Sequence, residues 1–173
     1  LNSGGVSFAV SSYPDTAHPG QFTGAFVASA KVLYHKLDFA FSILAEILTR
    51  SRLDDEKRLK EILAMLKSRL QMSFQSSGHT TSALRALSYG SPLSKFKDDT
   101  DGIGFYEVVR DIEEHFEEKK AELIQNLKQL SRQIFRVDNV MISYTSSEDG
   151  LAPMEAAFRE IKDTLYPELD GEE

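Results

Sequence analysis

The stretch Asp54–Phe74, DDEKRLKEILAMLKSRLQMSF, decides the fold prediction because its apolar residues recur every three or four positions. The residues that share this period are Leu59, Ile62, Leu63, Leu66, Leu70 and Phe74. This spacing places them on one face of an α-helix and leaves charged residues on the other. Asp54 is a suitable N-cap, and Gly78 is well placed to end the helix. The stretch predicts a long amphipathic helix whose apolar face must be buried.

The residues before this helix predict a β-hairpin and then a buried helix. Apolar and small or polar residues alternate over 6–10 and again over 22–33, which is the period of half-buried strands. The segment 13–20 between them is rich in Pro, Asp and Gly and predicts a loop. Gly24 in the second strand indicates a bulge or a close backbone approach. From about Lys36 the apolar period changes to that of a helix packed against a sheet.

The residues after the central stretch predict more helices and one further strand. A short helix follows Thr80 or Thr81 and stops at Gly90. The segment 91–104 is rich in Asp, Ser and Gly and is interpreted as an irregular, mobile loop. A helical region over 105–134, with a break near Glu117, leads to alternating residues at 140–144 that predict a third strand. Pro153 suits the first turn of a final helix.

These elements predict an α+β fold, in which a small antiparallel or mixed sheet packs against several helices. Their order is two strands, four or five helices, a strand and a helix. We expect one truncated domain over 1–167 and an acidic tail over 168–173. Three strands are few for so many apolar helix faces, and the opening Leu1-Asn2-Ser3-Gly4-Gly5 has no initiator Met. Both features favour a piece of a longer polypeptide.

The composition narrows the class of protein. The chain has 27 Asp and Glu against 20 Lys and Arg, a net charge of -7, and no dense basic cluster that would neutralise phosphates, so we expect no nucleic-acid partner. Cysteine is absent, which rules out disulfides and thiolate metal sites. No apolar run approaches the roughly 20 residues that span a bilayer, so we expect no membrane association. The expected location is the cytoplasm, or an organelle matrix in a eukaryote.

No pattern in the chain predicts catalytic or metal-binding residues. None of the four histidines is paired with another at helical ligand spacing. His115-Phe116-Glu117-Glu118 matches the start of the inverted zinc motif H-x-x-E-H, but Lys119 stands where the second ligand belongs. Asp98, Asp99 and Asp101 resemble a calcium loop, yet the required Gly and Glu positions fail. Asp101 is instead expected near the cap of the next helix.

One segment, Ser77–Tyr89, concentrates side chains that can bind a peptide. Arg85 and Tyr89 are four residues apart, so they share a helix face and can together bind a carboxylate or a peptide carbonyl. His79 lies in the same segment. The alternative is a structural corner whose polar groups satisfy backbone ends. His79, Arg85 and Tyr89 are therefore the candidate substrate-binding residues.

The pattern S-G-H-x-x-x-A-x-R-A-L-S-Y in this segment resembles the presequence-protease branch of the insulinase (pitrilysin) superfamily. The resemblance extends over nearly the whole chain, including the glycine pair before Val6 and the segment 139–145. It implies a clamshell zinc endopeptidase that encloses unfolded peptides between two lobes. The chain resembles part of the third of four domains, in the lobe without zinc. No zinc ligand or catalytic Glu of the family has a matching position here.

The sequence therefore predicts a non-catalytic piece of a zinc metallopeptidase, inactive alone and forming part of the wall of a peptide chamber. Zinc is expected only in the other lobe of the parent enzyme, and the expected partners are that catalytic lobe and unfolded peptides. The alternative is a helical interaction module with no enzymatic parent, which binds a partner through the amphipathic helix 59–74. Self-association through exposed strand edges is compatible with either.

Overall fold

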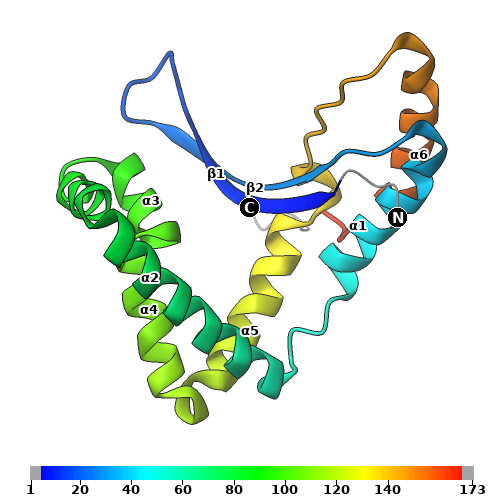
Figure 1. The fold of residues 1–173 in the computed structure, drawn as a ribbon. Coiled ribbons are helices and arrows are strands. Elements are labelled where there is room, and N and C mark those ends of the chain that lie inside the picture. The colour runs from blue at the N-terminus through cyan, green and yellow to red at the C-terminus, as the bar shows by residue number, and fades with distance from the viewer. Residues whose placement is uncertain (1–4, 169–173) are drawn as a thin grey trace. The chain divides into compact units, whose positions relative to one another are not determined.

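The computed structural model describes residues 5–168, which form a hairpin and a series of helices (Figure 1). Contacts divide these residues into two compact units. Unit 1 contains residues 5–9, 28–53 and 125–168, and unit 2 contains 10–27 and 54–124. The predicted α+β class is confirmed. The single domain over 1–167 stays a prediction, and the predicted tail lies outside the described residues except for Glu168.

Strands β1 (Val6–Pro14) and β2 (Phe22–Ala30) form the predicted two-stranded hairpin. The loop between them is held by the Asp15 carboxylate, which accepts hydrogen bonds from the backbone N–H of Ala17 and His18. The close approach predicted at Gly24 is confirmed, although the neighbour is a side chain. A Cβ there would lie 2.8 Å from the Phe96 ring, so only glycine leaves room for that ring.

The core of unit 2 is built on α2 (Glu56–Ser88), the helix predicted from the central stretch. Leu63 is buried with Val109 and Phe116, and other apolar residues of the predicted stripe pack around them. The N-cap is Asp55, not Asp54, and its carboxylate accepts from the Arg58 N–H. The helix does not end at Gly78. It kinks at Ser77, where φ is -133° and ψ is 33°, and the predicted short helix continues from the kink.

The predicted loop over 91–104 is wrong, because most of it is helix α3 (Pro92–Asp101). The Ser91 side chain caps α3 by accepting from the Ser94 N–H, and Pro92 fits the first turn. Helix α4 (Ile103–Glu114) follows at once, and α5 (Phe116–Ile134) follows after a break at His115. Figure 1 shows α2, α3 and α4 lying side by side.

Unit 1 is built on α1 (Leu37–Arg50) and α6 (Leu151–Lys162), which pack on each other. Tyr166 Oη donates to the Thr49 carbonyl at 3.3 Å, which ties the end of the chain to α1. Short 3-10 helices lie at Tyr34–Lys36, Val137–Asn139 and Glu148–Gly150. The later part of α5 belongs to this unit.

The third strand predicted over 140–144 is wrong. Within residues 5–168 the segment after Asn139 has no ladder partner, and Met141 is 94% exposed. A strand needs a hydrogen-bonded neighbour, whereas the bridge nearest in sequence joins Arg136 to Tyr166 in isolation. The alternation of apolar residues therefore has no sheet here to belong to.

Candidate functional site

The predicted binding residues lie on the half of α2 that follows the kink at Ser77. Arg85 and Tyr89 come together as their spacing predicts, with the guanidinium carbon 5.7 Å from the ring centroid. His79 is exposed and lies six residues before Arg85, about 120° around the helix. The structure therefore joins two of the three candidates and places the third on another face.

Arg85 is anchored mainly to a buried carboxylate that the sequence did not single out for this role. Its Nη1 lies 2.6 Å from Asp98 Oδ2, and its Nη2 lies 3.3 Å from Glu107 Oε2. The bond to Asp98, followed by that to Tyr89, raises the pKa of Arg85 above its usual value. The guanidinium therefore links α2 to α3 and α4, and its charge is already balanced by protein carboxylates.

Asp98 is completely buried and also begins α4. Its carboxylate accepts from the backbone N–H of Ile103 at 3.1 Å and of Gly104 at 3.2 Å. A Cβ at Gly102 would lie 2.5 Å from Asp98 Oδ1, so glycine leaves the space that this carboxylate fills. Asp98, and not the predicted Asp101, is the acidic residue that caps the helix.

Tyr89 supplies the accessible surface of this candidate site. Its side chain is 80% exposed, and Leu87 next to it is 61% exposed. A phenol ring held beside a fixed guanidinium offers an apolar face and a hydroxyl to an approaching peptide. The arrangement can bind, but it contains no nucleophile with an activating base.

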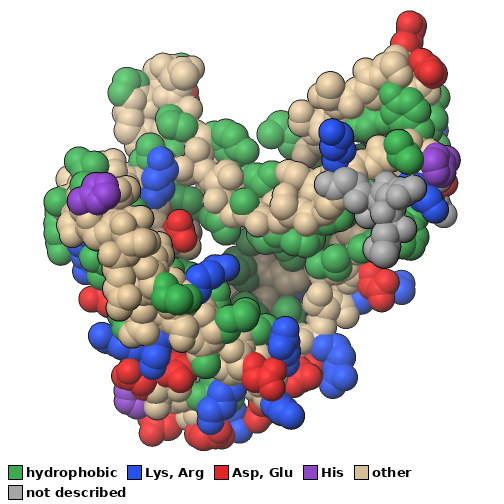
Figure 2. All heavy atoms as spheres, viewed as in Figure 1, with side chains coloured by type: hydrophobic (Ala, Val, Ile, Leu, Met, Phe, Trp, Pro, Cys, Tyr) green, Lys and Arg blue, Asp and Glu red, His purple; other side chains and the backbone are tan. Residues whose placement is uncertain are grey.

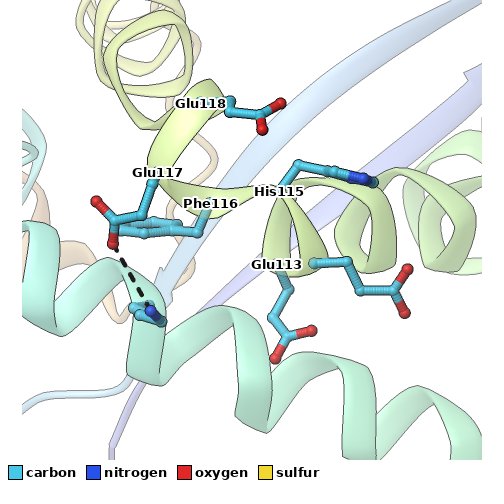
Figure 3. A pocket seen from close by; sticks show the side chains of 7 residues that line it. Glu113, His115, Phe116, Glu117 and Glu118 are labelled. Atoms are coloured by element: carbon cyan, nitrogen blue, oxygen red, sulfur yellow. Dashed lines mark ion pairs between the residues drawn. The ribbon is translucent and has the colours of Figure 1, made fainter.

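The near-miss zinc motif at the break between α4 and α5 is a network of ion pairs. Figure 3 shows Glu117 directed toward Lys60, with 3.7 Å between Oε1 and Nζ. Lys119 pairs with Asp111, and Lys120 Nζ lies 2.9 Å from Glu117 Oε2. Lys119 lowers the pKa of Asp111, and Lys120 lowers that of Glu117. Figure 2 shows charged side chains of both signs at this end of unit 2.

The residues present at this break do not fit a zinc ion. Lys119 places an ammonium group where a ligand is needed, and the nearby carboxylates are occupied by lysines. Within residues 5–168, no three His, Asp or Glu side chains are grouped so that they could hold a metal ion. No helix in the same range has the length and apolar character needed to cross a bilayer.

Comparison with known proteins gives the family context of this site. Residues 1–112 match the model of a family described as associated with subfamily C of the insulinase-type peptidases. The chain is 28% identical to Protein HypA of Clostridium perfringens over 149 residues, which is 86% of this chain and 15% of that protein. It is 21% identical to the mitochondrial presequence protease of Danio rerio over 156 residues, or 90% of this chain and 15% of that one.

A mitochondrial presequence protease of Yarrowia lipolytica is 26% identical over 135 residues, covering 76% of this chain and 13% of that protein. The chain thus spans 13–15% of the length of these relatives. The family match includes α2 and the Arg85–Tyr89 pair.

Proposed function

Because the chain belongs to this peptidase-associated family of the insulinase type, we propose that it is a non-catalytic part of a zinc metalloendopeptidase, where it forms part of the wall of a chamber that encloses unfolded peptides. The family match over residues 1–112 is the observation that carries this proposal, and it agrees with the resemblance to the insulinase superfamily. Two similar proteins named presequence protease add support for a peptidase.

In this proposal the hydrolytic chemistry comes from elsewhere in the polypeptide. A zinc ion there would polarise the scissile carbonyl and activate a water molecule. The residues described here fit a different task, because their carboxylates and lysines largely pair with each other in unit 2. The chain supplies a shaped surface beside the reaction.

Within that surface we assign peptide contact to the exposed ring of Tyr89, with Arg85 as its positioning residue. Asp98 and Glu107 hold the guanidinium in place, and the guanidinium in turn lies against the ring. His79 is an additional contact on a separate face of the helix. The partners are the catalytic lobe of the same polypeptide and unfolded peptide substrates, in the cytoplasm or an organelle matrix.

The proposal is tested by binding without cleavage. The purified chain should bind a fluorescent unfolded peptide, and mass spectrometry should show that peptide intact after prolonged incubation. Tyr89→Ala should weaken binding about threefold to tenfold, as expected for loss of one exposed aromatic contact. Met72→Ala, at another exposed position of α2, is the matched control. Cleavage of the peptide by the purified chain would refute the non-catalytic assignment.

The competing function is a helical interaction module without an enzymatic parent. The exposed Met65 and Met72 on α2, at 59% and 62%, favour this alternative because methionine adapts to many partner surfaces. The coding sequence upstream discriminates the two. An H-x-x-E-H motif several hundred residues before Leu1 supports the peptidase, and an open reading frame without it supports the module.

A further inference from the structure

A groove in unit 1 lies between α1 and α6 and encloses about 410 Å³. Its floor is apolar, with Ala45 5% exposed and Ala157 1% exposed, and Ile161 extends it. Phe39 lines the groove with a side chain that is 62% exposed. Small residues on two packed helices thus leave a depression that accepts an apolar side chain.

The rim of the groove carries a regular row of polar residues from α1. Asp38, Ser42, Glu46 and Arg50 follow one another at four-residue intervals, so they lie along one face of the helix. Over residues 5–168, Asp38, Glu46 and Arg50 take part in no ion pair. These three charges face a lined depression with no protein counter-charge among the described residues.

The spacing of the two carboxylates fits an extended peptide. Eight residues of helix place Asp38 and Glu46 about 12 Å apart along the axis. Four residues of extended chain cover about 13 Å, and residues four apart point to the same side, as does the residue midway between them. Two basic side chains four residues apart therefore match the carboxylates, and the residue between them faces the apolar floor.

From this match we propose that the α1–α6 groove binds an extended cationic peptide segment with Lys or Arg at two positions four residues apart and an apolar residue midway. The Ser42 hydroxyl is placed to hydrogen-bond the peptide backbone between the two basic residues. Arg50 lies one turn beyond Glu46 and favours an acidic group or a carboxyl terminus at that end, which sets the direction of the peptide. The inference rests on the proposed peptide-chamber function and adds a sequence preference and a second contact surface to it.

The test uses a fluorescein-labelled peptide with lysine, serine, leucine, serine and lysine in sequence, titrated with the chain and followed by anisotropy. A peptide of the same composition with the lysines three residues apart should bind more weakly, because its charges point to opposite sides. Replacing both lysines by glutamates should abolish binding. Equal affinity for the three peptides would overturn the proposal.

Variants of the chain locate the binding. Asp38→Asn with Glu46→Gln should weaken binding of the lysine peptide up to about tenfold, as expected for two exposed ion pairs. Glu122→Gln, an exposed site on α5, is the charge-matched control and should leave the affinity unchanged. Ser42→Trp, at an exposed rim position, should block the groove while circular dichroism stays the same. Unchanged affinity in both groove variants would overturn the proposal.

Two further outcomes separate this inference from its neighbours. Dimerisation that Ser42→Trp abolishes would show that a second copy fills the groove, which would overturn the peptide assignment. A chain that binds unfolded peptides without this lysine preference would leave the proposed function standing and reject only the groove. A chain that cleaves peptides would reject the non-catalytic function whatever the groove binds.

Discussion

Units 1 and 2 use charge in different ways. In unit 2, carboxylates and basic groups pair across helices, as in Lys67–Glu113 at 2.6 Å and Arg85–Asp98 at 2.6 Å. In the α1–α6 groove of unit 1, Asp38 and Glu46 have no ion-pair partner among residues 5–168. Charges already matched inside a unit hold helices together, whereas unmatched charges around an apolar depression are available to a ligand. The comparison distinguishes a scaffold from a binding surface.

The largest expected difference concerns an aromatic residue in each unit. Phe116 is 4% exposed in the core of unit 2, so Phe116→Ala should lower the free energy of unfolding by about 4 kcal/mol. Phe39, 62% exposed on the groove, should cost less than about 0.5 kcal/mol on replacement by Ala, yet weaken binding of the lysine peptide. Urea unfolding and anisotropy measure the two effects. A large loss of stability for Phe39→Ala would make it a core residue.

The next largest effect is expected at the buried carboxylate of unit 2. Asp98→Ala removes the partner of Arg85 and the cap of α4, and should cost about 3 kcal/mol of unfolding free energy. The neighbouring Asp99→Ala removes only an exposed pair with Lys95 and should cost less than about 1 kcal/mol. Equal losses in urea unfolding would show that the buried network is not what joins α2, α3 and α4.

Acid should destabilise the junction of α4 and α5. Lys119 lowers the pKa of Asp111 below 3.8, and Lys120 lowers that of Glu117 below 4.5. The stability that these carboxylates contribute is present above those ordinary values and is lost as pH falls through the lower folded-state values. Thermal unfolding between about pH 6 and pH 3 should show the decline. Lys119→Met with Lys120→Met should flatten it, and an unchanged slope in that variant would reject these pairs as its source.

The smallest effect on stability is expected in the groove. Asp38→Asn and Glu46→Gln remove charges that have no ion-pair partner among the described residues, so the midpoint of urea unfolding should stay unchanged. Glu113→Gln, which breaks the half-buried pair with Lys67, should lower the midpoint. If the groove variants lowered it equally, the distinction between the two units would fail.

Local periodicity predicted the elements whose stability depends on local signals. The apolar stripe of Asp54–Phe74 placed α2 and its buried Leu63 correctly, and the spacing of Arg85 and Tyr89 predicted their contact. The loop prediction for 91–104 failed because the turn-forming composition outweighed two genuine helix signals. Those signals were Ser91 as a cap and Pro92 in the first turn.

What the sequence did not reveal depends on residues that are distant along the chain. Asp98 is buried because Arg85, thirteen residues earlier, neutralises it and because glycines leave room beside it. The segment 140–144 has a strand-like alternation, but only a neighbouring strand would make it part of a sheet. The groove joins Ala45 to Ala157, and no local pattern shows that two such helices pack together.

The zinc content of the purified chain tests the central claim most directly. After dialysis against zinc-free buffer, atomic absorption should find far less than one zinc ion per chain, because the described residues offer no group of ligands and the family match is to a peptidase-associated part. One zinc ion retained per chain, lost again in His115→Ala, would contradict the account and place a metal centre within this chain.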